Sequence, residues 1–162
     1  MNLESLAAWL ESGTVHTLMV EKFWLFPLME TIHFVGLSFM FGSLLLIDGR
    51  VLGIAKFINM REAMKFIPVA IVAFAFNLIS GYCFLTSDPN AYIYNIGFQW
   101  KMIMIIVAGV NALWFYIGEH KELVQLADGQ DAPFRAKLIA LISIVVWVVV
   151  IILGRMIPYT DF

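Results

Sequence analysis

The chain has 162 residues, of which 62% are hydrophobic and only 14% are charged, and its mean hydropathy is +0.89. Soluble domains carry about 25% charged residues, so this composition indicates a membrane protein. The formal net charge is only −2, and without a basic patch we expect no nucleic-acid partner.

Residues 1–22 precede the first long apolar run and are acidic and polar, with no basic segment of the kind that begins a secretory signal. We therefore expect the first membrane span to remain in the mature protein. Leu3, Leu6, Trp9 and Leu10 recur at helical intervals. This spacing predicts a short amphipathic helix that lies in the membrane interface.

Four apolar stretches follow, over residues 23–47, 66–86, 98–118 and 137–157. Each is close to the length of about 20 residues that a helix needs to cross a bilayer. The sequence therefore predicts an all-α, polytopic membrane protein. Its four transmembrane helices form an antiparallel bundle, and residues 1–162 make one membrane domain together with the N-terminal interfacial helix.

Lysine and arginine are distributed unequally between the two sides of these spans. One side comprises the connection after the first span and the connection after the third. It holds Arg50, Lys56, Arg61, Lys65, Lys121, Arg135 and Lys137. The other side holds Lys22, Lys101 and Arg155. The positive-inside rule places the richer side in the cytoplasm, so we expect a bacterial inner (cytoplasmic) membrane protein with both termini in the periplasm.

Polar residues interrupt the spans at Glu30, His33, Asn77, Asn111 and Arg155. At 1.5 Å per residue His33 lies about 15 Å deep and Glu30 about 10 Å deep, and both fall on one helix face. Lipid-facing charges are rare, so we expect these groups to point into the bundle. There they would form a column, with Arg155 and Glu30 nearest the outer surface.

Glu30 and His33 form a Glu-x-x-His pair, a spacing that places two metal ligands on one face of a helix. Dinuclear carboxylate bundles use this motif twice, with two further glutamates. The motif occurs once here, so a dinuclear site is not expected. A mononuclear metal on His33 would need a third ligand that the sequence does not identify.

A haem b is the second hypothesis for His33, because an intramembrane histidine is a common axial ligand. Gly36 would leave space for a porphyrin, and Arg155 would neutralise a propionate. His16 is the candidate second axial ligand, because His120 falls at the cytoplasmic end of the third span. A quinone held between the helices near His33 belongs to the same class of redox or accessory module.

The third hypothesis involves no ligand. Glu30 and Arg155 would pair as ions, and His33 would hydrogen-bond to Glu30, to an asparagine or to a backbone carbonyl. At the cytoplasmic end of the first span, Asp48 and Arg50 are expected to anchor the helix at the membrane surface. Lys101 is expected to serve as another surface anchor.

Four segments together resemble the signature blocks of a family of small bacterial four-helix membrane proteins of unknown function. They are PLMETIHFVGLSFMFGSLLLIDGRVLG, IPVAIVAFAFNLISGYCF, YNIGFQWKMIMIIVAGVNALWFY and WVVVIILGRMIPY. The residues here that match positions recurring in the family are Glu30, His33, Asp48, Arg50, Lys101, Gly154 and Arg155. Family members often carry a histidine where this chain has Tyr116. The resemblance implies an integral membrane protein without assigning an activity. A looser likeness to small b-type cytochromes and copper-resistance membrane domains rests on architecture and one histidine.

Three classes of function fit these features. The first is a redox or accessory module that binds haem or a quinone. The second is a proton or small-solute channel or transporter, which we expect to be a homo-oligomer because four helices alone leave little lumen. The third is a non-catalytic structural subunit of a membrane complex. The chain has no Walker loop, no Gly-x-Ser-x-Gly and no His-Glu-x-x-His, so no enzymatic activity of its own is predicted.

Overall fold

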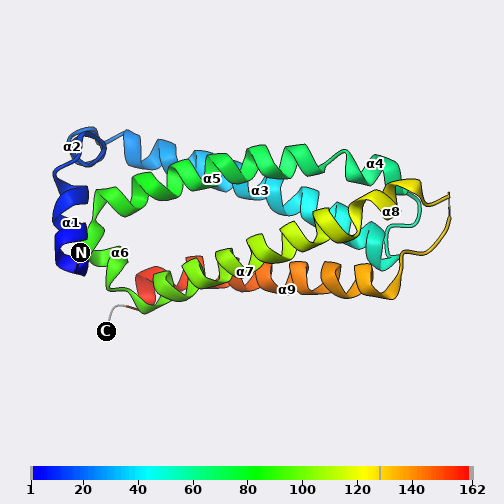
Figure 1. Ribbon diagram of the computed structural model, residues 1–162. Coiled ribbons are helices and arrows are strands. Elements are labelled where there is room, and N and C mark those ends of the chain that lie inside the picture. Colours follow the sequence, from blue (N-terminus) through cyan, green and yellow to red (C-terminus); the bar gives the residue numbers. More distant parts are fainter. Residues whose placement is uncertain (1, 128, 161–162) are drawn as a thin grey trace.

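The computed structural model describes residues 2–127 and 129–160 (Figure 1). This part of the chain is an all-α bundle, which confirms the predicted fold class. Its four long helices are α3 (Leu25–Leu52), α5 (Ile67–Ser87), α7 (Ile96–Gly118) and α9 (Phe134–Met156). They are long and apolar enough to cross a membrane, and the protein is an integral membrane protein surrounded by lipid.

The predicted spans differ from the helices mainly at the end of the first. It was expected to end at residue 47, but α3 continues to Leu52. Gly53 then ends the helix with a left-handed φ of 87°, and its N–H donates to the carbonyls of Gly49 and Arg50. A residue without a Cβ adopts this conformation at little cost. The additional turn carries Asp48 and Arg50 into the protein.

The long helices pack in the order α5, α3, α9, α7. Helix α3 lies along both α5 and α9, and α7 lies along α9, whereas α5 and α7 are not a closely packed pair. Figure 1 shows α3 and α5 together on one side of the bundle and α7 and α9 on the other. The bundle is therefore tight along three seams and loose along the fourth, between α5 and α7.

Small residues let α3 and α5 approach closely. A Cβ added at Gly36 would lie 3.0 Å from Oδ1 of Asn77 and 3.2 Å from the carbonyl oxygen of Ala73. Gly36, Met40 and Ser43 share a helix face with Glu30 and His33, and these three are buried, whereas Glu30 on the same face is exposed. Without a strong hydrophobic drive between helices in lipid, such close backbone approach is a main source of association.

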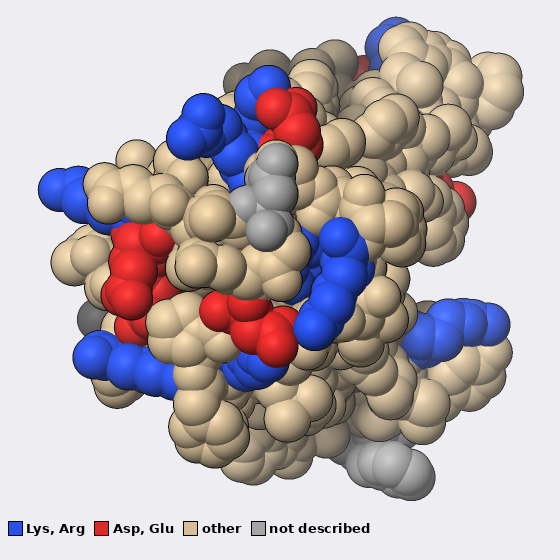
Figure 2. All heavy atoms as spheres, turned by 90° about the vertical axis from the view of Figure 1, so that its right-hand side faces the viewer, with Lys and Arg blue, Asp and Glu red and all other residues tan. Residues whose placement is uncertain are grey.

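One end of the bundle carries the short helices α4 (Met60–Met64) and α8 (His120–Gln125). Val51 and Leu123 are fully buried in a cluster that joins these short helices to α3 and α9. Basic and acidic side chains intermingle on the surface of this end, which faces the viewer in Figure 2. Arg135 Nε lies 3.0 Å from Glu119 Oε1 there.

The opposite end carries α1 (Leu3–Glu11), α2 (Thr14–Glu21), α6 (Pro89–Ile93) and the 3₁₀ turn η1 (Ile157–Tyr159). The single helix expected within residues 1–22 is thus divided in two. Gly13 lies in extended backbone with a ψ of 150° and caps the start of α2. Glycine weakens a helix interior and favours such a break. Ala7 and Leu10 of α1 pack against Ile93 of α6.

Candidate functional site

His33 has a partner within the protein. Its Nδ1 lies 2.8 Å from the Oγ of Ser80 on α5. The Ser80 hydroxyl has one proton, which it donates to the carbonyl of Phe76 at 2.8 Å. Ser80 therefore accepts from His33 Nδ1–H, which leaves Nε2 of the neutral ring without a proton. The expected side-chain partners of His33, Glu30 and the asparagines, do not take this place.

A small pocket lies beside His33 and Glu30. Its volume is about 80 Å³, and its lining residues are Phe26, Glu30, His33, Phe34, Phe84 and Tyr92. Sites for ligands of drug size occupy about 300–1,000 Å³. A porphyrin does not fit this space, so the arrangement around His33 does not match a haem site.

Second ligands for His33 are also missing among the described residues. His16 Nδ1 donates to the carbonyl of Thr86 at 2.7 Å, and His120 lies at the other end of the bundle in α8. Across residues 2–127 and 129–160, no three His, Cys, Asp or Glu side chains gather closely enough to hold a metal ion. The geometry gives no support to a metal at His33.

The expected ion pair between Glu30 and Arg155 is absent from the described part of the chain. Both residues are exposed. Arg155 Nη2 donates to the Tyr159 hydroxyl at 3.3 Å, and its guanidinium lies 5.3 Å from the centre of that ring. Lys101, expected at the surface, is half-buried and lies against Gly154 on α9. Arg155 thus turns towards the end of its own helix, where it contacts Tyr159.

The two asparagines belong to different seams. Asn77 is buried between α3 and α5, where its Nδ2 lies 3.9 Å from the sulfur of Met40. Asn111 on α7 donates from Nδ2 to the carbonyl of Ile139 on α9 at 3.3 Å. The Oδ1 atom of Asn77 is buried and has no hydrogen-bond partner in the described structure. The polar residues of the spans therefore do not form the expected continuous column, because Asn77 and Asn111 make their contacts in different helix pairs.

Asp48 and Arg50 are buried inside the protein, contrary to the expectation that they anchor α3 at the membrane surface. Both were placed at the membrane surface, but Asp48 is 4% exposed and Arg50 is 1% exposed. Arg50 Nε donates to the carbonyl of Ile58 at 2.6 Å, and its Nη2 reaches the carbonyl of Gln130 at 3.5 Å. Arg50 thus fastens two loops to the end of α3. Asp48 leaves the helix in another direction and reaches a cavity.

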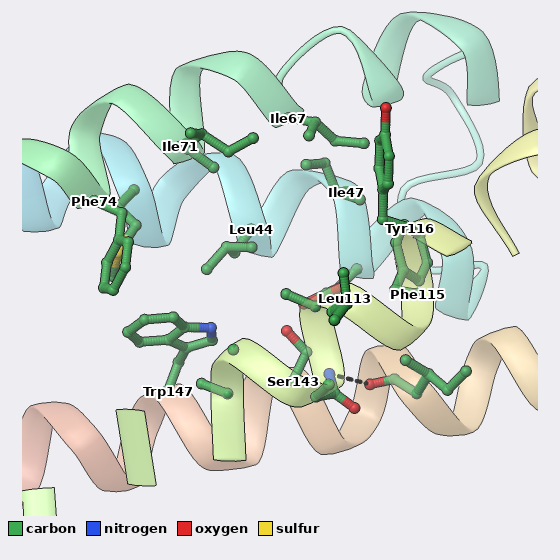
Figure 3. Close-up of a pocket in the computed structure, with 18 of the residues that line it drawn as sticks. Leu44, Ile47, Ile67, Ile71, Phe74, Leu113, Phe115, Tyr116, Ser143 and Trp147 are labelled. Atoms are coloured by element: carbon green, nitrogen blue, oxygen red, sulfur yellow. Dashed lines mark hydrogen bonds between the residues drawn. The ribbon is translucent and has the colours of Figure 1, made fainter. Parts of the chain in front are cut away.

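This cavity has a volume of about 430 Å³, which is larger than the pocket beside His33. It lies where α5 and α7 fail to pack, and α3 and α9 contribute to its walls (Figure 3). The walls are mainly apolar and aromatic, with Phe74, Leu113 and Trp147 among them. Its volume and lining match those of small-molecule sites in proteins.

Few polar groups line the cavity. Asp48 and Asn111 lie in its wall, and Ser143 on α9 interacts with the Asp48 carboxyl. The Oδ2 atom of Asp48 is buried and has no hydrogen-bond partner in the described structure. Sequence reasoning missed both Ser143 and the cavity. The sequence does place Asp48 on the helix face of Glu30, 18 residues earlier or five full helical turns.

Comparison with known protein families, with curated proteins and with solved structures finds no match to this chain. The resemblance to a family of small four-helix membrane proteins therefore stays a prediction.

Proposed function

We propose that this protein binds a small lipid-soluble molecule in the cavity between α5 and α7. The observation that carries the proposal is a space of about 430 Å³ with mostly apolar walls, inside the membrane-spanning part of the bundle. Sites of this size and lining hold ligands that are mostly apolar and carry a few polar groups. Membrane quinones belong to this class of molecule, so the proposal retains the quinone hypothesis and moves it from His33 to the cavity.

The loose seam between α5 and α7 supports entry from the bilayer. The other neighbouring long helices pack along each other, whereas α5 and α7 do not. A molecule dissolved in the lipid would reach the cavity between these two helices without crossing a polar surface. A binding protein of this kind needs no continuous polar path, and the separate contacts of Asn77 and Asn111 give a channel no particular support.

The proposal also includes the orientation of the bundle in the membrane, which follows from the distribution of lysine and arginine. Seven of the ten lysines and arginines lie at or near the end that carries α4 and α8, the end seen in Figure 2. The positive-inside rule assigns that end to the cytoplasm of a bacterium. The cavity then lies in the cytoplasmic half of the inner membrane, and both termini lie in the periplasm.

Quenching of tryptophan fluorescence tests the binding. The chain has five tryptophans, and Trp147 lines the cavity. We expect 1-bromodecane, added to protein in lipid nanodiscs, to quench Trp147 saturably, because its bromine enters a limited site. The variant Trp147→Phe should lack the saturable part of the quenching, which identifies that part as the signal of Trp147.

A matched pair of glycine variants provides the control. Gly109 lines the cavity and Gly42 does not, and a Cβ at either position meets no atom within 4 Å. Gly109→Leu should fill the cavity and abolish the saturable quenching, whereas Gly42→Leu should preserve it. Quenching that rises without saturation, or that is the same in both variants, would overturn the proposal.

A further inference from the structure

We infer that the molecule in this cavity is an amphiphile whose polar end donates a hydrogen bond to Asp48, through an amine or a hydroxyl group. The inference rests on the proposed function and specifies its ligand class. Three features of the described structure support it: the burial of Asp48, the absence of an ion pair between it and a basic side chain, and its position at the end of the stretch of α3 that lines the cavity.

The burial of Asp48 leaves its carboxyl incompletely satisfied. Asp48 is 4% exposed, its Oδ2 has no hydrogen-bond partner in the described structure, and Ser143 is its polar neighbour. Buried polar atoms are nearly always hydrogen-bonded, and each exception calls for a specific explanation. A donor brought by a ligand into the adjoining cavity supplies such an explanation.

No basic side chain of the described structure forms an ion pair with Asp48. Arg50, two residues later, donates from Nε and Nη2 to the carbonyls of Ile58 and Gln130, and its buried Nη1 has no hydrogen-bond partner in the described structure, Asp48 included. A buried carboxylate without a partner is strongly disfavoured. An ammonium group offers both a charge and a donor, and a hydroxyl group offers the donor alone.

The cavity extends along α3 as far as Asp48. Along α3 its wall runs from Met40 to Asp48, a helical rise of about 12 Å. Asp48 is the last residue of this stretch. Figure 3 shows Phe74 and Trp147 together at the opposite end of the view from Ile47, the neighbour of Asp48 in the chain. An elongated ligand would therefore place its donor beside Asp48 and its apolar body between α5 and α7.

The inference is tested with three brominated probes that differ only in one end: 1-bromodecane, 10-bromodecanol and 10-bromodecylamine. Saturable quenching of Trp147 gives their affinities, each corrected for partition into the nanodisc lipid. We expect wild type to bind the amine and the alcohol about tenfold or more tighter than the alkane. Asp48→Asn should remove most of this preference, especially for the amine, and still bind 1-bromodecane.

Binding of 1-bromodecane by Asp48→Asn also shows that the variant is folded around its cavity. Equal corrected affinities for the three probes in wild type, or a preference unchanged in Asp48→Asn, would overturn the inference and leave the proposed function standing. No saturable quenching by any probe would overturn both. The two failures are therefore distinguishable in one set of titrations.

Discussion

His33 and Ser80 join α3 to α5 through a contact of 2.8 Å between Nδ1 and Oγ. The serine proton is directed to the backbone carbonyl of Phe76, so the histidine is the donor. This contact gives the intramembrane histidine a place in the seam between two helices. It requires neither a metal nor a haem to explain the position of the ring.

The first prediction concerns the tautomer of His33. We expect ¹⁵N NMR of histidine-labelled protein to show neutral His33 protonated at Nδ1. Ser80→Ala should remove the acceptor and shift the population towards the Nε2–H form. Ser38→Ala is the matched control, because Ser38 also donates to a carbonyl of its own helix at 2.8 Å but is exposed on α3. A wild-type ring protonated at Nε2 alone would contradict the assignment.

The second prediction concerns the close approach of α3 and α5. Gly36→Leu introduces a side chain whose Cβ alone meets Asn77 and Ala73 at 3.0–3.2 Å. Overpacking of this kind costs about 1–3 kcal/mol, so we expect a lower midpoint of thermal unfolding in detergent. Gly42→Leu, where a Cβ meets nothing within 4 Å, should leave the midpoint nearly unchanged. Equal midpoints for the two variants would show that the seam is not tight at Gly36.

The third prediction compares two ion pairs at the α4 and α8 end. The Glu119 side chain is 5% exposed and pairs with Arg135, whereas Lys56 and Asp131 are both about half exposed. Arg135→Ala leaves a buried carboxyl group unpaired, which costs about 1–3 kcal/mol. Lys56→Ala removes an exposed pair, and such pairs contribute little. Thermal unfolding of the two variants measures the difference, and an equal loss in both would contradict the role of burial.

The fourth prediction is a pH dependence at Tyr92, which lies in α6 outside the membrane-spanning helices. Burial first, and then the charges of Asp88 and Glu30, raise the pKa of Tyr92 above its ordinary value of 10.0. The folded protein then holds this proton more tightly than the unfolded chain does. The associated stability is present below pH 10 and is lost as the pH rises through the raised folded pKa.

Ultraviolet titration of the phenolate measures this shift, with Tyr92→Phe used to identify the component. Glu30→Gln should lower the pKa of Tyr92 part of the way towards 10, because it removes one of the raising charges. A phenolate component of Tyr92 that titrates at or below 10 would show that the ring is neither buried nor close to these carboxylates. Tyr92→Phe should also lose less stability than wild type above pH 10.

Several features of the fold follow from the sequence alone. The four spans are evident because about 20 apolar residues in succession suit the thickness of a bilayer. Helical periodicity places Gly36, Met40 and Ser43 on one face, since residues three and four apart share a face, and all three are buried. Glu30 belongs to the same face but is exposed. The end of α3 did not follow from the sequence, because charged residues usually mark the end of a span and here the helix continues past Asp48 and Arg50 to Leu52.

Only the tertiary structure determines which groups each polar side chain contacts. Sequence gives the depth and phase of Glu30 and Arg155, but not the direction of a long side chain, and Arg155 turns to Tyr159 four residues along its own chain. Asp48 was expected at the surface, but it is covered where α3 meets α9. The cavity arises because α5 and α7 do not pack together. A missing contact between helices leaves no periodic signal in either of their sequences, so only the packed bundle reveals it.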